Sequence, residues 1–209
     1  MNNFKEHWDN THTRRLNHKI RYDNWLDNYQ DVLKKCNTEV LDLGCGSGND
    51  TLYLIERGFK VLSCDYSEIA LNKVKQEIPN SKTIQLDISQ KMPFKNSSFD
   101  LIIADLSLHY FDEITTFNIM EELKNILTTG GYLLARVNST ADINHGAGQG
   151  EKIEENFYYV EGYNKRFFTI DDANKFFSKI GNVEIKEAEM LRYSKPKQLL
   201  EIKVQKSGR

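Results

Sequence analysis

A short glycine-rich segment near residue 40 places the strongest constraint on the fold of this chain. The β-prone run Glu39-Val-Leu-Asp42 leads into glycines at alternate positions, Gly44, Gly46 and Gly48, and a helical pattern begins at Asn49. Glycine is needed where the backbone takes a positive φ or where a ligand lies against the main chain, and a helix N-terminus offers free N–H groups. The segment therefore predicts a strand, a tight turn and a helix that together bind a small polar ligand.

The spacing of these glycines argues against two common nucleotide-binding turns. The dinucleotide fingerprint G-x-G-x-x-G would place its third glycine at Asn49 or Thr51, depending on the register. The P-loop requires Gly-Lys followed by Ser or Thr, and the chain contains no such tripeptide. Both a nicotinamide oxidoreductase and a P-loop protein are therefore disfavoured.

From Glu39 onward, strand-like and helix-like segments alternate along the chain. Strands are predicted at residues 40–43, 60–65, 83–87, 99–104 and 132–137, with helices at 49–57, 67–78, 113–127 and 169–180. This alternation is typical of a parallel sheet with helices on both faces. Two further apolar-polar runs, 183–190 and 198–204, predict a hairpin. We expect an α/β, Rossmann-like fold with a seven-stranded, mostly parallel sheet and a C-terminal antiparallel hairpin.

The segments outside this pattern complete a single predicted domain. Leu16, Ile20 and apolar residues between 25 and 33 recur at helical spacing, which predicts one or two amphipathic helices. The connection over 138–166 is too long for a plain loop and is suspected of a function. We expect one domain over 1–209, made of an N-terminal helical cap (1–36), a cofactor-binding half (37–138), a lid-like connection (139–168) and a C-terminal helix and hairpin (169–209).

Composition limits the partners and the compartment. The 209 residues carry a net charge of -2, so no strong positive field attracts nucleic acid or an anionic membrane. The polar N-terminus and the lack of long apolar runs predict a cytoplasmic protein without a membrane partner, either a monomer or a homodimer. Cys36, Cys45 and Cys64 are scattered and lack metal-ligand spacing, so we expect reduced thiols and no metal.

Acidic residues end the second and third predicted strands. A carboxylate at Asp65 can accept hydrogen bonds from both hydroxyls of a ribose bound over the glycine turn. Asp87 can accept one from an adenine amino group, while Ile88 covers the ring. Because the carboxyl ends of parallel strands meet at one edge, Asp42, Asp65, Asp87 and Ala104 should border one crevice. The pattern indicates a ligand that contains a nucleoside.

The glycine turn resembles motif I of the class I S-adenosylmethionine-dependent methyltransferases, an acidic residue, x, then G-x-G-x-G. Four further segments are similar to the same superfamily, in particular to its type 11 group. They are Asp65–Leu71 (D-x-S-x-x-x-L), Lys91–Asp100 (L-P-F-x-x-x-S-F-D, with Met92 for Leu), Leu106–Tyr110 (aliphatic-x-L-H-H, with Tyr110 for the second His) and Gly130-Gly131 (L-x-P-G-G, with Thr129 for Pro). The resemblance spans roughly residues 38 to 137.

The resemblance implies the cofactor S-adenosyl-L-methionine and a direct in-line transfer of its methyl group. The protein then has to align donor and acceptor and to exclude water. Carried over by position, the resemblance assigns the methionine part of the cofactor to Asp42, Gly44, Cys45, Gly46 and Gly48, and the amino group to the backbone carbonyl of Ala104. It assigns the ribose to Asp65, with Tyr66 beside it, and the adenine to Asp87 and Ile88.

Candidate residues on the acceptor side are less well defined. His109 is the only general base that the sequence suggests, with packing or a cofactor contact as the alternative. Tyr22 and Trp25 are large for a solvent-facing surface, so they either pack in the core or cover the bound molecules. Arg136 and Asn138 lie at the end of the fifth strand and should face the acceptor, where Arg136 either pairs with a substrate carboxylate or phosphate or forms a structural ion pair.

A small-molecule methyltransferase is the leading hypothesis from the sequence. An RNA or protein methyltransferase is the alternative, with the basic residues of 14–21 as its contact surface. The segment after the fourth strand is Ala104-Asp-Leu-Ser107, whereas methylation of amino groups on bases commonly uses an N-P-P-Y type tetrapeptide. A non-catalytic subunit that only binds S-adenosylmethionine stays open as a third hypothesis.

Overall fold

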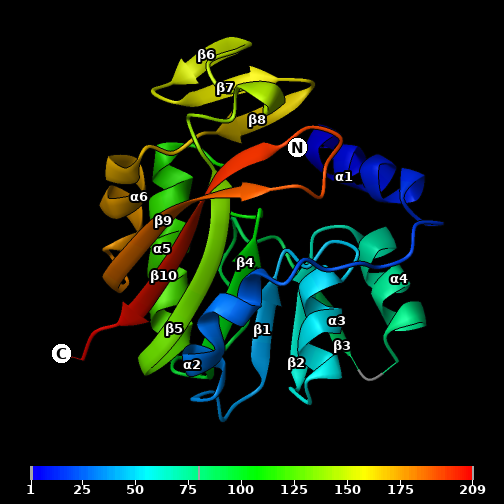
Figure 1. Ribbon diagram of the computed structural model, residues 1–209, viewed down its shortest axis with the longest axis vertical. Helices are drawn as coiled ribbons and strands as arrows, with labels where there is room; N and C mark the ends of the chain where they lie inside the picture. The colour runs from blue at the N-terminus through cyan, green and yellow to red at the C-terminus, as the bar shows by residue number, and fades with distance from the viewer. Residues whose placement is uncertain (1, 80, 209) are drawn as a thin grey trace.

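A seven-stranded sheet organises the protein (Figure 1). The computed structural model describes residues 2–79 and 81–208. The strand order is β3-β2-β1-β4-β5-β10-β9, in which the first five run parallel and β10 is antiparallel to both of its neighbours. The predicted mostly parallel sheet with a C-terminal hairpin is confirmed. The strands are β1 (Val40–Leu43), β2 (Val61–Asp65), β3 (Lys82–Gln85), β4 (Phe99–Asp105), β5 (Leu127–Asn138), β9 (Gly181–Met190) and β10 (Lys197–Lys206).

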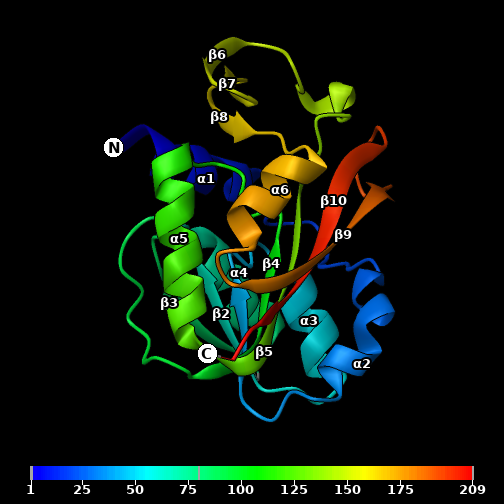
Figure 2. The same ribbon diagram turned by 90° about the vertical axis from the view of Figure 1, so that its left-hand side faces the viewer.

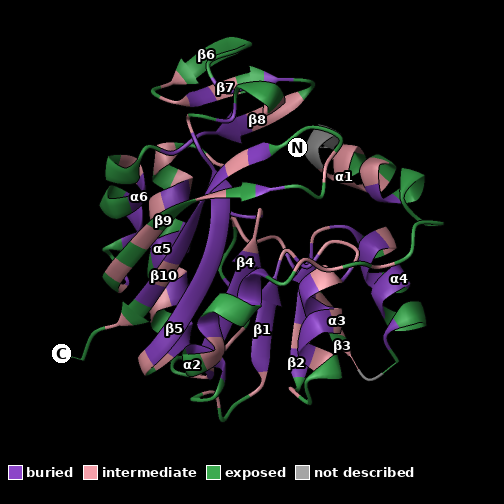
Figure 3. Cartoon of the chain, viewed as in Figure 1, coloured by how far each residue is buried: buried purple, intermediate pink, exposed green. Residues whose placement is uncertain are grey.

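Helices cover both faces of the sheet (Figure 2). On β4, Ile102 packs into the core beneath α5 and α6, whereas Leu101 packs into a second core with α2 and α3. Successive side chains of a strand point to opposite faces, so an unbroken apolar strand serves both cores. Figure 3 shows the buried central strands that result. The helices are the 3₁₀ helix η1 (Trp25–Tyr29), α2 (Gln30–Leu33), α3 (Asn49–Glu56), α4 (Glu68–Glu77), α5 (Glu113–Ile126) and α6 (Ile170–Phe177).

The N-terminal segment differs from the prediction. The helix α1 covers Asn2–Arg14, and no helix forms over residues 15–24, so the helix predicted from Leu16 and Ile20 is wrong. The cause is a long-range contact. The Lys73 ammonium on α4 donates hydrogen bonds to the backbone carbonyls of Arg15, Leu16 and His18, which replaces the partners that a continuing helix would supply. The chain therefore leaves α1 extended and crosses over α4.

The long connection after β5 builds a small sheet of its own. Strands β6 (Glu151–Glu154), β7 (Phe157–Val160) and β8 (Tyr163–Arg166) pair antiparallel. The Arg166 backbone N–H donates to the His109 carbonyl at 2.7 Å and so fixes β8 to the segment after β4. In Figure 1 this sheet and α1 lie together above the carboxyl ends of the parallel strands. Within residues 2–79 and 81–208, no helix combines the length and apolarity needed to cross a membrane.

Candidate functional site

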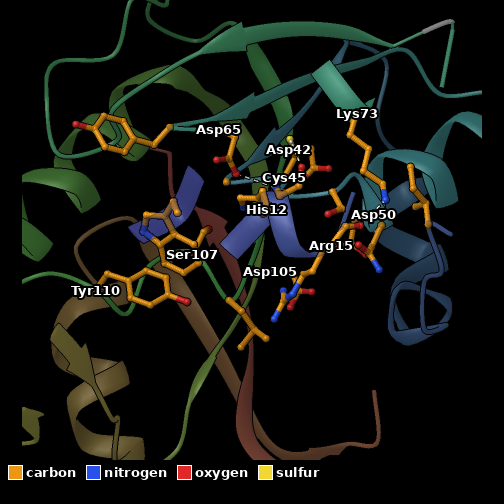
Figure 4. Close-up of a pocket in the computed structure, with 18 of the residues that line it drawn as sticks. His12, Arg15, Asp42, Cys45, Asp50, Asp65, Lys73, Asp105, Ser107 and Tyr110 are labelled. Carbon is orange, nitrogen blue, oxygen red and sulfur yellow. Dashed lines mark hydrogen bonds between the residues drawn. The ribbon is translucent and has the colours of Figure 1, made fainter. Parts of the chain in front are cut away.

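A cavity of about 640 Å³ lies at the carboxyl edge of β1, β2 and β4, under α1 (Figure 4). The ends of parallel strands in an open sheet are the usual place for a ligand. Eight of the ten residues assigned to the cofactor line this cavity, namely Asp42, Gly44, Cys45, Gly46, Asp65, Tyr66, Asp87 and Ile88. Gly48 and Ala104 lie below its surface. Gly48 begins α3 with φ +86°, and Ala104 is fully buried in β4.

The glycine turn follows the wall of the cavity. Gly44 has φ +73°, and a Cβ there would lie 2.3 Å from Cβ of Ser107, so this position needs glycine for both its backbone and its packing. Gly46 has φ +52°, and the nearest atom to its Cβ would be Cε1 of His12 at 3.4 Å. The N–H of Gly46 donates to Oδ2 of Asp65 at 2.8 Å. The turn thus presents bare backbone to the cavity at Gly46.

Asp65 and Asp42 accept hydrogen bonds from the glycine turn and from the helices beside it. Asp65 also accepts a hydrogen bond from the N–H of Ser67 through Oδ1 at 2.8 Å. Each carboxylate oxygen can accept more than one hydrogen bond, so Asp65 keeps capacity for ligand hydroxyls. Asp42 accepts a hydrogen bond from the Thr51 hydroxyl at 2.6 Å, and burial raises the pKa of Asp42 to about 7. Burial also raises the pKa of Asp65, although His12 partly opposes the change.

The inner face of α1 and the turn after it contribute residues that the sequence reasoning missed. Trp8, His12 and Arg15 all line the cavity. His12 is 7% exposed, and its Nδ1 is buried without a hydrogen-bond partner in the described part of the chain. Burial lowers the pKa of His12, while the charge of Asp65 opposes this. The hydroxyl of Ser67 donates to Oδ1 of Asp9 at 2.6 Å, which fastens α1 beside the start of α4. The four-residue spacing of Trp8 and His12, typical of one helix face, was the available signal.

Arg136 forms the structural ion pair that the sequence left as one of two alternatives. Its Nε and Nη2 donate to the two carboxylate oxygens of Asp105 at 2.7 and 2.8 Å, and its Nη1 donates to Asp23 at 2.9 Å. Its guanidinium also lies 4.6 Å from the ring centroid of Trp25. Although burial opposes ionisation, Arg136 and Arg192 lower the pKa of Asp105, which lines the cavity as a carboxylate.

Tyr22, Trp25 and Arg136 lie outside the cavities found among residues 2–79 and 81–208. The Trp25 indole N–H donates to Asp50 at 3.0 Å, and Tyr22 donates to Glu56 while its ring packs edge-on against Tyr53. These contacts place Trp25 in the core around η1 and leave Tyr22 packed against it. The assignment of the three residues to the substrate stays a prediction.

His109 and Asn138 meet at a second cavity of about 320 Å³. His109 is 3% exposed, and burial together with the charges of Lys197 and Lys165 lowers its pKa well below the usual range, so the imidazole is neutral. It does not line the larger cavity. The two cavities share part of their walls, so they adjoin each other. The shared residues are Trp8, Arg15, Leu106, Tyr110 and Tyr193.

Known proteins share both the sequence and the fold around this site. A family model of a methyltransferase domain matches residues 40–131. An uncharacterized methyltransferase from Synechocystis sp. is 32% identical over 93 residues, which cover 44% of this chain and 43% of that protein. The probable S-adenosyl-L-methionine-dependent methyltransferase TehB from Haemophilus influenzae is 33% identical over 117 residues, which cover 54% of this chain and 40% of TehB.

A solved structure extends the likeness to most of the chain. The structure of a SAM-dependent methyltransferase from Methanosarcina mazei aligns with a TM-score of 0.73 at 20% identity, over 87% of this chain and 98% of that chain. At that identity the match shows the fold. The two curated relatives match over less than half of their own length. The family-model match over residues 40–131, the relatives and the shared fold together support the class I S-adenosylmethionine-dependent methyltransferase superfamily for this chain.

Proposed function

We propose that this protein is an S-adenosylmethionine-dependent methyltransferase that acts on a small molecule by direct in-line methyl transfer. The observation that carries the proposal is the cavity of about 640 Å³ in which the glycine turn and the carboxylates of Asp65 and Asp87 share one wall. Ligand cavities commonly measure about 300 to 1,000 Å³. The sulfonium group of the cofactor supplies an activated methyl group, and the work left to the chain is alignment and exclusion of water.

The residues that line the cavity suit this cofactor. S-adenosylmethionine carries positive charge on its sulfonium and amino groups, and the cavity presents the carboxylates of Asp65 and Asp105. Opposite charges attract more strongly in a partly buried site than in water. His12, whose Nδ1 is buried without a hydrogen-bond partner in the described part of the chain, lines the same cavity. We assign the ribose to Asp65, the adenine to Asp87 with Ile88, and the methionine part to the glycine turn and Ala104.

The cover over the site supports a small acceptor. α1 and the sheet β6-β7-β8 lie above the carboxyl edge (Figure 1), and α1 and β8 both contribute residues to the second cavity. The net charge of -2 supplies no field for nucleic acid. An RNA or protein acceptor, and a subunit that binds the cofactor without turnover, are outcomes that the experiments below separate from the proposal.

A thermal-shift screen tests the cofactor, and labelled methyl transfer tests the reaction. A ligand that binds only the folded state raises the melting temperature, so S-adenosylmethionine and S-adenosylhomocysteine should stabilise the protein and NAD should not. Incubation with the methyl-labelled cofactor and fractionated cell extract should label the small-molecule fraction. Labelled RNA or protein would refute the acceptor class. A thermal shift without labelling of any fraction would favour the non-catalytic subunit, and no shift would refute the cofactor assignment.

A further inference from the structure

The second cavity, of about 320 Å³, has walls of a distinct chemical character. It is enclosed by the outer side of α1, the segment after β4, the end of β5, strand β8 and the β9–β10 turn. Leu106, at the boundary between the two cavities, has φ +55°, an unusual conformation for a non-glycine residue, and strained backbone is concentrated at functional sites. The smaller cavity therefore adjoins the larger cavity, to which we assign the cofactor.

One wall of this cavity is aromatic. The ring centroids of His7 and Tyr163 lie 4.2 Å apart, those of Trp8 and Tyr110 lie 4.9 Å apart, and those of Tyr110 and Tyr163 lie 5.9 Å apart. All four residues line the cavity. Rings that pack against one another present a rigid apolar surface on which a planar ligand can stack.

A second group of residues that line this cavity carries positive charge. Arg14, Arg15, Lys165 and Lys197 line the cavity, and Glu161 is the carboxylate among its lining residues. Glu161 pairs with Lys165 at 2.7 Å, and Lys197 pairs with Asp142 at 2.7 Å. Arg14 and Arg15 form no ion pair with a carboxylate in residues 2–79 and 81–208. The cavity therefore has an excess of positive charge.

Two residues that line this cavity each contain a buried polar atom without a hydrogen-bond partner in the described part of the chain. The atoms are Nδ1 of His109 and Oδ1 of Asn138, whose residues are 3% and 1% exposed. A buried polar atom without a hydrogen bond costs roughly 1–3 kcal/mol, so a ligand that supplies the bond recovers that cost. The amide oxygen of Asn138 can only accept, which calls for an N–H or O–H group on the ligand.

We infer that the second cavity binds the methyl acceptor and selects a planar small molecule that carries an anionic group, carboxylate or phosphate, together with an N–H or O–H donor. The anionic group lies against Arg14 and Arg15, the ring stacks on the aromatic wall, and the donor meets Asn138. This inference rests on the proposed function, because it assigns the chemical class of the acceptor for the same site.

Binding of matched probes to the full chain tests the inference. The probes are 4-aminobenzoate, 4-aminophenyl phosphate and the neutral 4-aminobenzamide, titrated calorimetrically into protein saturated with S-adenosylhomocysteine. We expect the two anions to bind at least tenfold more tightly than the amide, with a difference that shrinks at high salt because the charges are exposed to solvent. The stronger of the two anions identifies the carboxylate or the phosphate as the natural group.

Two variants separate charge recognition from general effects. Arg14 is exposed, so Arg14→Gln should leave the melting temperature unchanged while it weakens the anions about fivefold and leaves the amide unaffected. Lys34→Gln removes an exposed cation just after α2 that lines neither cavity, and should change nothing. Equal binding of amide and anions, unchanged anion binding by Arg14→Gln, or no binding by any probe would overturn the inference while S-adenosylhomocysteine still binds. Failure of S-adenosylhomocysteine to bind would instead overturn the proposed function.

Discussion

Replacement of Asp65 by alanine tests the proposed ribose contact and the role of this residue in the turn. In the free protein, its two oxygens accept hydrogen bonds from the N–H groups of Gly46 and Ser67, both at 2.8 Å. Asp65→Ala leaves these two donors unpaired, which lowers the free energy of unfolding by roughly 1–3 kcal/mol for a buried group. The substitution also removes a buried charge, which raises the free energy of unfolding. The two effects oppose each other, so we expect the variant to fold with a modestly lower melting temperature.

The loss in cofactor binding should be larger. Hydrogen bonds to a charged group are worth about 1.5–3 kcal/mol each. Loss of the bonds to two ribose hydroxyls should therefore cost at least about 3 kcal/mol of binding free energy, which is about 100-fold in affinity. At a ligand concentration of about 100 times Kd, wild-type protein gains about 2.7 kcal/mol, whereas the variant gains about 0.4 kcal/mol. For a chain of this length, 1 kcal/mol shifts the melting temperature by about 2–4 °C. The S-adenosylhomocysteine shift should thus fall from about 5–10 °C to about 1 °C.

Each protein has to be compared with its own ligand-free melting temperature. Thermal shift gives the first readout, and calorimetric Kd values at 25 °C give the second. Asp31→Ala, which removes an exposed carboxylate from α2, is the matched control and should keep the full shift. A ligand-induced shift of wild-type size in Asp65→Ala would refute the ribose assignment, whatever happens to the stability of the ligand-free variant.

Further substitutions address Asp42 and His109. Because burial raises the pKa of Asp42 to about 7, the folded chain keeps a proton there that the unfolded chain releases near pH 4, and this stabilisation is lost as the pH rises through 7. Asp42→Asn should therefore reduce the fall in unfolding free energy between pH 5 and pH 8 by about 3 kcal/mol, measured by urea denaturation. An unchanged pH dependence would contradict the raised pKa of Asp42. If His109 takes the acceptor proton, His109→Ala should lower the single-turnover rate by about 100-fold with unchanged cofactor affinity, and a wild-type rate would remove it from catalysis.

Local sequence was enough where short-range chemistry decides the structure. Ser67 caps α4 by accepting from the N–H of Ala70, and Thr169 and Asp172 form the capping box that begins α6. The glycine turn is equally local, because its spacing and the positive φ of Gly44 and Gly46 are properties of a few consecutive residues. The wall of the larger cavity that these residues form was therefore predictable.

Distant contacts decide what the sequence did not reveal. The helical spacing of Leu16 and Ile20 is overridden by Lys73, which lies 58 residues beyond Arg15 in the sequence and binds its carbonyl. Arg136 was predicted at the end of the fifth strand, but its ion pair depends on Asp105, 31 residues away, and on Asp23, 113 residues away. Patterns within one segment contain no information about such partners.

The two cavities divide one face of α1 between them. Trp8 lines both cavities, as does Arg15 in the turn that follows the helix. His12, about 40° to one side of Trp8, lines only the larger cavity. Thr11 and Arg14, about 60° and 120° to the other side, line only the smaller one. One helix thus contacts the proposed cofactor and the proposed acceptor through separate side chains.

This division predicts that the two binding functions of α1 can be changed independently. His12→Ala removes a group from the wall of the larger cavity, so S-adenosylhomocysteine should bind several-fold more weakly while 4-aminobenzoate binding to the saturated protein stays constant. Thr11→Val alters the wall of the smaller cavity at nearly constant volume and should change only the 4-aminobenzoate affinity. Calorimetry on both variants measures the two affinities. If either substitution changed both affinities to the same extent, α1 would act as a single lid, because loosening the whole helix from Ser67 and Lys73 would disturb both cavities at once.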